Sequence, residues 1–349
     1  MPENTETRKA DHINIVLSED VQGKGITTGF ERFFFEHQAL PEIDLDKIDL
    51  SLTLWGKKLQ APLLMSSMTG GTESAGVINL HLAEAAQALG VGMGVGSQRA
   101  ALEQSNLANT YQVRKVAPDI LLLANLGAVQ LNYGYGVNEA RRAVEMIAAD
   151  ALILHLNPLQ EAVQPGGDRL WCNLYEKIES LVTQLEVPVI IKEVGNGISP
   201  SVARRLANCG VAAIDVAGAG GTSWSEVEAY RQTDALRKQI AHGFASWGIP
   251  TALTLMEVRK AVPEIPIFAS GGIRTGVDAA KAIALGATLV GSAAPLLSPA
   301  TNQAQTVYAK FALLIEELKI AAFCTGSANL EMLSQAPLRR QDTWELVPR

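Results

Sequence analysis

The feature that most constrains the fold is a short apolar run that recurs eight times between residues 61 and 294. The first run, "APLLMSSMTGG", begins like a buried strand and stops at small and polar residues. Nearly continuous apolar character is typical of parallel strands that are buried on both faces. The expected strands span residues 61–67, 91–97, 120–127, 150–157, 187–194, 211–218, 265–272 and 287–294.

The segments between these runs carry helix signals. In residues 73–89, Ile78, Leu82, Ala85 and Leu89 follow one another at spacings of four, three and four, which places them on one helix face. Alternating strands and helices of this number predict an α/β fold, the (β/α)8 TIM barrel. The alternative is an open doubly wound sheet, which usually has fewer strands and a G-x-G-x-x-G turn after the first. Neither feature is clear in this chain.

Three regions divide the chain. Residues 1–60 are expected to form an N-terminal extension that packs on or over the barrel, and residues 61–345 to form the barrel itself. The last four residues, "LVPR" at 346–349, look like a remnant of an engineered protease site. The connection at 219–250 is long for a compact domain, and such segments are often functional.

Composition narrows the classes of function. Apolar residues make up 48 % of the 349, enough for a large core, and the net charge of −7 argues against a nucleic-acid partner. The three cysteines are far apart and without metal-ligand spacing, which predicts reduced thiols in a cytoplasmic protein. No apolar run reaches about 18 residues, so no membrane span is expected.

Polar residues gather where the predicted strands end, and in a TIM barrel those ends carry the active site. The candidates, in chain order, are Ser67, Met68, Thr69, Ser97, Gln98, Arg99, Asn125, His155, Asn157, Gln160, Glu161, Lys192, Thr222, Gly271, Gly272, Ile273, Ser292 and Ala293.

The last two strand ends predict a phosphate site. "ASGGIRTG" and "VGSAAP" follow strands seven and eight, where barrels frequently bind phosphate with backbone N–H groups and a helix N-terminus. Glycine lets the backbone approach a phosphate closely. A plain tight turn at Gly271 and Gly272 is the alternative.

Lys192 is a charged residue near the end of an apolar strand. A surface lysine is one interpretation, but flanking helices should direct this side chain into the barrel mouth. There it could stabilise negative charge on a cofactor or substrate, or form a Schiff base. The electrostatic role is favoured because of the neighbouring phosphate site.

His155, Asn157, Gln160 and Glu161 crowd after one strand, which favours a functional cluster. A single carboxylate suits Mg2+, which uses one or two carboxylates together with substrate phosphates. The early basic residues in "RKADHI", Arg8 and Lys9 among them, suggest a solvated tail on residue type alone; an arm that binds an anion together with Arg99 is the alternative.

These motifs resemble the type 2, flavin-dependent isopentenyl-diphosphate isomerases. The matching segments are "RKADHI", "SSMTGG", "GVGSQRA", "LHLNPLQE", "IIKEVGNG", "GAGGTSW", "ASGGIRTG" and "GSAAP", and they follow the family's order from residue 8 to about 295. The resemblance implies interconversion of isopentenyl and dimethylallyl diphosphate with FMN, Mg2+ and reducing equivalents from NADPH. It also implies a cytosolic homo-oligomer, a tetramer or an octamer.

The resemblance also implies roles for residues. FMN would contact Ser67, Met68, Thr69, Ser97, Asn125, Lys192, Thr222, Gly271, Gly272, Ile273, Ser292 and Ala293. The C5 isoprenyl diphosphate would meet Arg8, Lys9, Ser97, Gln98, Arg99, His155, Asn157 and Gln160. Glu161 would hold Mg2+, and Gln160, His155 and Lys192 would serve the chemistry.

Three rival functions use the same barrel. An FMN-dependent 2-hydroxy-acid oxidase needs a His base and Arg residues near the later strands, and "GAGGTSW" has no such pair close by. A non-catalytic phosphate-binding barrel would bind no flavin. An enzyme like inosine-monophosphate dehydrogenase needs a nucleophilic cysteine on a barrel loop, whereas Cys172 and Cys209 are expected in helices.

Overall fold

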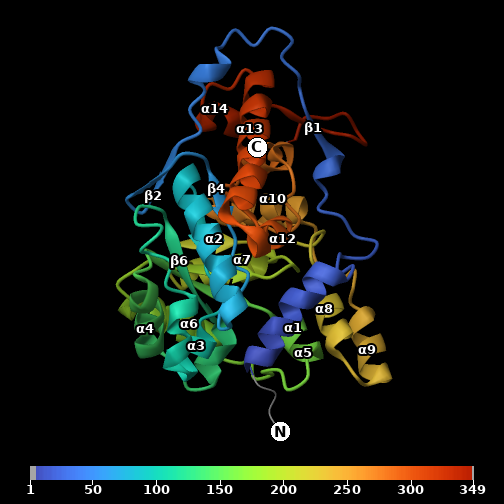
Figure 1. Ribbon diagram of the computed structural model, residues 1–349. Helices are drawn as coiled ribbons and strands as arrows, with labels where there is room; N and C mark the ends of the chain where they lie inside the picture. Colours follow the sequence, from blue (N-terminus) through green and yellow to red (C-terminus); the bar gives the residue numbers. More distant parts are fainter. Residues whose placement is uncertain (1–4, 348–349) are drawn as a thin grey trace.

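The computed structural model describes residues 5–347, and its centre is a closed barrel of parallel strands (Figure 1). Each of the predicted apolar runs contains one strand, so the expected TIM barrel is confirmed. Strands adjacent in the chain pair with each other, and β11 closes the ring on β4. The barrel strands are β4 (Leu63–Met65), β5 (Gly92–Gly94), β6 (Leu122–Gly127), β7 (Ala151–Leu156), β8 (Val189–Glu193), β9 (Ala213–Asp215), β10 (Ile267–Ala269) and β11 (Leu289–Ser292).

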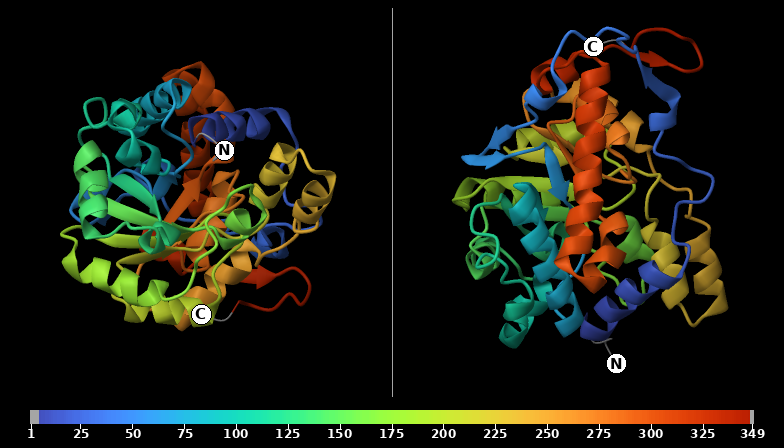
Figure 2. Two further views of the ribbon diagram at one scale, coloured as in Figure 1. Left: turned by 90° about the horizontal axis from the view of Figure 1, so that it is seen from below. Right: turned by 45° about the horizontal axis from the view of Figure 1, so that its top comes forward.

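Helices enclose these strands, as the left view of Figure 2 shows. The predicted helix at 73–89 is confirmed as α2 (Glu73–Leu89), which Thr72 caps and left-handed Gly90 ends. The other helices after β5 are α3 (Arg99–Glu103), α4 (Val137–Ile147), α5 (Pro158–Val163), α6 (Leu174–Gln184), α7 (Pro200–Asn208), α8 (Trp224–Arg231), α9 (Ala235–His242), α10 (Thr251–Ala261), α11 (Gly276–Ala284), α12 (Ala294–Asn302), α13 (Ala304–Cys324) and α14 (Leu330–Ser334).

Apolar side chains fill the inside of the barrel toward the amino-terminal ends of its strands. The carboxyl ends of the strands remain open for a site. Leu64, Leu123, Ile153, Ile190 and Phe268 point inward and are buried. The hairpin of β2 (Leu52–Leu54) and β3 (Lys57–Leu59) covers the amino-terminal end of this cluster with two buried leucines. Each fully buried side chain of this kind contributes about 1.5–3 kcal/mol, so this end is a firm base.

The N-terminal extension reaches both ends of the barrel. Its helix α1 (Thr5–Ser18) lies beside α5 and α8 at the lower end of Figure 1, and β1 (Phe33–Phe35) lies at the upper end. There β1 pairs in antiparallel fashion with β12 (Leu338–Arg340). The extension is thus tied to the last part of the chain, and α1 is left over the carboxyl ends of the strands.

Two expectations about local structure are corrected. Cys172 does not lie in a helix: it is exposed in the turn before α6, where its carbonyl accepts from Asn132 Nδ2 at 2.9 Å. Cys209 directly follows α7 and is buried. The long connection at 219–250 is largely helical, since it contains α8 and α9.

The two chain ends are only partly described. Leu346 bridges to Arg339, and the N–H of Val347 donates to the carbonyl of Leu338 at 2.8 Å, so the first half of "LVPR" continues the contact with β12. The last two residues of that stretch lie outside the described range. Within residues 5–347, no helix has the length and apolar character needed to cross a bilayer.

Candidate active site

A cavity of about 270 Å³ lies at the carboxyl ends of the barrel strands, beneath α1. Its lining includes every residue predicted for the site except Gln98. These are Arg8, Lys9, Ser67, Met68, Thr69, Ser97, Arg99, Asn125, His155, Asn157, Gln160, Glu161, Lys192, Thr222, Gly271, Gly272, Ile273, Ser292 and Ala293. Residues as far apart in the sequence as Arg8 and Ala293 therefore meet in one place.

Gln98 is the exception because its side chain is fully buried beneath the cavity floor. Its Oε1 accepts the N–H of Asn125 at 3.0 Å, and its Nε2 donates to the carbonyl of Ala143 at 2.8 Å. Both ends of the amide are thus used within the protein. The structure gives Gln98 a supporting contact to β6 and not a position facing a ligand.

The turn after β10 brings two loops together at one side of the cavity. Gly271 and Gly272 have φ of 98° and 75°, which favour glycine. A Cβ at Gly271 would lie 2.2 Å from the carbonyl oxygen of Gly218, so only glycine permits this approach. Close by, α12 begins at Ala294 with its N-terminus at the cavity. Backbone N–H groups and the helix dipole both favour an anion here.

Several buried hydroxyls around the cavity have no hydrogen-bond partner among the described residues. They belong to Ser66, Ser67 and Thr222. A buried polar group without a partner costs about 1–3 kcal/mol, so native proteins usually pair such groups. These hydroxyls therefore mark a place where a polar ligand completes the structure.

Lys192 supplies a buried positive charge at the cavity floor. Its Nζ donates to the carbonyl of Glu193 at 2.8 Å and to Ser270 Oγ at 3.3 Å, and lies 3.6 Å from Asp215 Oδ2. Ser270 in turn donates to Asp215 Oδ1 at 2.7 Å. The ammonium group is held in one position, facing whatever occupies the barrel mouth.

His155 stays neutral at physiological pH. Burial, followed by the charges of Lys192 and Lys9, lowers the pKa of His155 to about 4. Its Nδ1 lies 2.8 Å from Asn125 Oδ1, so the neutral ring donates there and leaves Nε2 as an acceptor. This geometry supports a binding role for His155 and makes it a poor acid near pH 7.

Glu161 has three donors on its carboxylate. Asn157 Nδ2 donates to Oε1 at 3.0 Å, while Gln164 Nε2 and the N–H of Asp168 donate to Oε2. A carboxylate has about four lone-pair positions, so one remains for a further ligand. Burial is the largest of several influences on its pKa, which is raised. The described residues contain no group of three or more His, Cys, Asp or Glu that could hold a metal by themselves.

Gln160 takes part in a polar chain that the sequence did not reveal. Its Nε2 donates to Glu228 Oε1 at 3.0 Å, and its Oε1 accepts from Asn157 Nδ2 at 3.1 Å. His12 Nε2 lies 2.9 Å from the same Glu228 oxygen. Burial raises the pKa of Glu228, but its contacts with His12 and Arg231 outweigh that effect and lower it.

The N-terminal arm is part of the site. Lys9 Nζ donates to the carbonyl of Ser97 at 2.8 Å and to the hydroxyl of Tyr111. Burial, followed by repulsion from Arg8, lowers the pKa of Lys9 to about 7. A solvated tail would show neither effect, so the structure favours the alternative of an arm that closes over the barrel.

The residues that sequence reasoning missed at the site include the following four. Gln130 lines the cavity, and Asp168, Asp215 and Glu228 hold lining side chains in place. Asp215 ends a barrel strand, which was an available signal. The other three come from segments between strands, where no periodicity points to the cavity.

Comparison with known proteins identifies the family. A curated protein from Synechocystis sp., named isopentenyl-diphosphate delta-isomerase, is 68 % identical over 336 residues, with 96 % of each chain covered. A second of that name, from Stutzerimonas stutzeri, is 61 % identical over 333 residues, covering 95 % of this chain and 96 % of its own. The chain belongs to the type 2 isopentenyl-diphosphate delta-isomerase family. The resemblance noted in the sequence is therefore confirmed.

Two further comparisons concern the barrel. Residues 165–340 match the model of the FMN-dependent dehydrogenase family. A mandelate oxidase solved with (S)-2-phenylpropionate superposes with a TM-score of 0.67 at 20 % identity, covering 96 % of this chain and 97 % of its own. At that identity the likeness shows the fold alone. It gives no support to the rival 2-hydroxy-acid oxidase, and the family excludes a non-catalytic barrel.

The cavity fits FMN, the cofactor of the matching family. The glycine turn and the N-terminus of α12 suit a phosphate, and the unpartnered hydroxyls of Ser66, Ser67 and Thr222 suit polar edges of a flavin. Lys192 lines the same cavity and would supply a cation to a flavin bound there. The dehydrogenase-like rival with a cysteine nucleophile is not supported, because neither Cys172 nor Cys209 lines the cavity.

Proposed function

We propose that this protein interconverts isopentenyl diphosphate and dimethylallyl diphosphate by adding and removing a proton, with reduced FMN and Mg2+. The observation that carries the proposal is one cavity with cations at one side and the chain Gln160–Glu228–His12 at another. A diphosphate needs the first feature, and a proton transfer at carbon needs the second.

FMN would be held by the residues around the glycine turn and the strand ends. They are Ser67, Met68, Thr69, Ser97, Asn125, Lys192, Thr222, Gly271, Gly272, Ile273, Ser292 and Ala293. When bound and reduced, FMN supplies an electron-rich ring and a nitrogen that can carry a proton. Lys192 would stabilise negative charge on that ring, because Ser270 and Asp215 hold its ammonium group in place.

The diphosphate would be bound by Arg8, Lys9 and Arg99, with Ser97, His155 and Asn157 as further partners. Lys9 donates to the carbonyl of Ser97, two residues before Arg99, so two neighbouring cations can divide the charge of two phosphate groups. Mg2+ would join the diphosphate to Glu161 through its remaining lone pair. The proposed metal site is therefore complete only with substrate.

Gln160 orients the reacting end of the substrate. Glu228 and Asn157 hold the two ends of its amide, which leaves one N–H of Nε2 free to face the cavity. The chain to Glu228 and His12 gives a proton a route between the cavity and α1. Trp224, whose ring stacks edge-on against His12 at a centroid distance of 5.2 Å, helps exclude water from this side.

The isomerase assay is the direct test. The protein is reconstituted with FMN, reduced without oxygen, and given isopentenyl diphosphate and Mg2+ in D2O. We expect dimethylallyl diphosphate carrying solvent deuterium, detected by NMR. Substrate recovered unchanged, while lactate or glycolate reduces the flavin, would instead favour the oxidase. NADPH as reductant, assembly into tetramers or octamers, a cytoplasmic location and the division at residue 60 are further parts of the proposal.

A further inference from the structure

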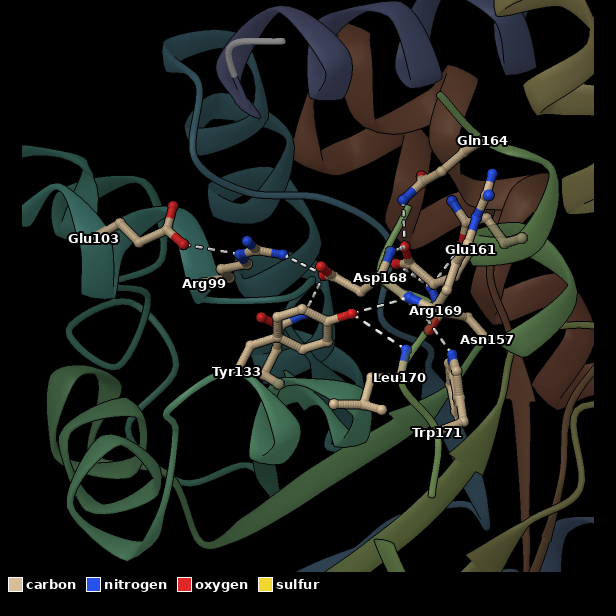
Figure 3. A network of polar contacts seen from close by, with 12 residues as sticks. Arg99, Glu103, Tyr133, Asn157, Glu161, Gln164, Asp168, Arg169, Leu170 and Trp171 are labelled. Atoms are coloured by element: carbon tan, nitrogen blue, oxygen red, sulfur yellow. Dashed lines mark hydrogen bonds and ion pairs between the residues drawn. The ribbon is translucent and has the colours of Figure 1, made fainter. Parts of the chain in front are cut away.

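Arg99 is a cation of the cavity that two carboxylates hold in place. Its guanidinium group donates from Nε to Glu103 Oε1 at 2.8 Å and from Nη1 to Asp168 Oδ2 at 2.7 Å. Figure 3 shows Arg99 stretched between these two carboxylates. Although burial lowers the pKa of Arg99, the two acids outweigh that effect and raise it. The side chain is thus kept charged and in one orientation.

Asp168 lies between the cation and the proposed metal carboxylate. The same Oδ2 that binds Arg99 also accepts from Gln130 Nε2 at 2.8 Å. The backbone N–H of Asp168 donates to Glu161 Oε2 at 2.7 Å. One residue therefore contacts Arg99, Gln130 and Glu161 at once, as Figure 3 shows for the first and last of them.

The surrounding loop is built to bring Asp168 there. A Cβ at Gly167 would lie 2.0 Å from the carbonyl oxygen of Glu161, so the loop can approach α5 only with glycine at this position. Trp171 Nε1 donates to the carbonyl of Asp168 at 2.8 Å and fixes the loop from its other side.

Two oxygens in this region still lack a partner. Gln130 Oε1 and Asn157 Oδ1 are buried without a hydrogen bond among the described residues, and both residues line the cavity. Gln130 is 5 % exposed and Asn157 is 4 % exposed. Asp168 accepts from the amide nitrogen of Gln130, and this contact also fixes the position of the unpartnered Gln130 Oε1. The network thus ends in groups prepared for a hydrated cation or a ligand donor.

We propose that Asp168 is a positioning residue for the diphosphate: its side chain fixes the Arg99 guanidinium and the Gln130 amide against the Glu161 end of the site. This rests on the proposed function, because it presumes that Arg99 binds the diphosphate. The inference opposes a simple electrostatic expectation. If Asp168 were only a nearby negative charge, neutralising it would strengthen the binding of an anion.

The test uses D168N, which keeps the shape and the backbone N–H but removes the charge. The FMN-loaded protein is titrated with inorganic pyrophosphate in the presence of Mg2+ by calorimetry. We expect D168N to bind pyrophosphate at least about tenfold more weakly, because a charge-assisted contact is lost. In steady state KM should rise more than kcat falls. Asp119→Asn, the same change at an exposed site bonded to Gln87, is the matched control and should bind like the wild type.

A double-mutant cycle separates positioning from a general effect. In an Arg99→Gln background, D168N should add less than about twofold, since the group it positions is gone. Asp168→Ser repeats the measurement if D168N folds poorly, as judged by circular dichroism. Equal or tighter pyrophosphate binding by D168N, or full additivity with Arg99→Gln, would overturn the inference. Wild-type protein that binds no pyrophosphate would instead overturn the proposed function.

Discussion

Gln160 Nε2 donates to Glu228 Oε1 at 3.0 Å and so links α5 to α8, the helix packed beside it. The two residues are 68 positions apart in the chain. Asn157 holds the other end of the Gln160 amide, so this side chain has little freedom. A group fixed at both ends can orient a substrate without losing rotamer entropy at each turnover.

Gln160→Asn should therefore lower kcat while substrate affinity changes little. The shorter amide cannot reach Glu228 and Asn157 together, and we expect a loss on the order of 10²-fold, as for a misplaced proton-transfer group. Steady-state kinetics with isopentenyl diphosphate measures it. Gln184→Asn, at the exposed end of α6, is the control. An unchanged kcat in the Gln160 variant would remove this residue from the chemistry.

Glu161→Gln should raise the Mg2+ requirement. The carboxylate has one lone pair left for the metal, and an amide is neutral and offers a weaker oxygen ligand. We expect the half-saturating Mg2+ concentration to rise about tenfold or more in the isomerase assay. Glu186→Gln, which alters only an exposed pair with Arg141, should leave the metal titration unchanged. A wild-type metal titration for the Glu161 variant would reject the ligand role.

The barrel and much of its rim could be predicted because they depend on local patterns. Each strand is a short apolar run, and parallel strands direct their carboxyl ends to one place, so residues such as Lys192 and Gly271 follow from topology. Glu228 and Asp168 could not be found this way. They act through contacts to Gln160 and Arg99. Those contacts depend on how α8 packs against α5 and on where the loop before α6 lies.

Gln98 was predicted to face the site but does not line the cavity. It stands beside Ser97 and Arg99 at a strand end, and both neighbours line the cavity. Residue type and position could not reveal that its amide turns inward to bond the backbone of β6 and α4. The direction of a single side chain after a strand depends on packing, which the sequence pattern does not record.

Gly70→Ala should destabilise the protein more than a positive φ alone explains. Gly70 has a φ of 156°, and a Cβ there would lie 2.0 Å from Cε1 of the buried Tyr111 ring. We expect the free energy of unfolding to fall by about 2–4 kcal/mol, through overpacking added to backbone strain. Gly25→Ala, with a φ of 68° and nothing within 4 Å of its Cβ, isolates the strain and should cost about 1 kcal/mol. Chemical denaturation compares the two; equal losses would contradict the packing argument.

Binding of a diphosphate should change the protonation of Lys9. Its pKa is lowered to about 7, chiefly by burial, so the amine is mostly neutral in the free protein above that pH. A bound anion favours the charged form and raises this pKa, so binding takes up a proton. Affinity should then fall as pH rises above 7, by up to about tenfold per pH unit until the pKa of the complex is reached.

Lys9→Met tests this linkage because it removes the titrating group and keeps an apolar stem. Pyrophosphate has protonation steps of its own, but these act on both proteins and cancel in the comparison. Calorimetry at pH 8 in two buffers of different ionisation enthalpy gives the number of protons taken up on binding. Wild-type protein should take up nearly one proton more than Lys9→Met. The fall in affinity from pH 7 to 9 should also be shallower for Lys9→Met. If the two proteins take up the same number of protons, Lys9 does not change its charge when the arm meets its ligand.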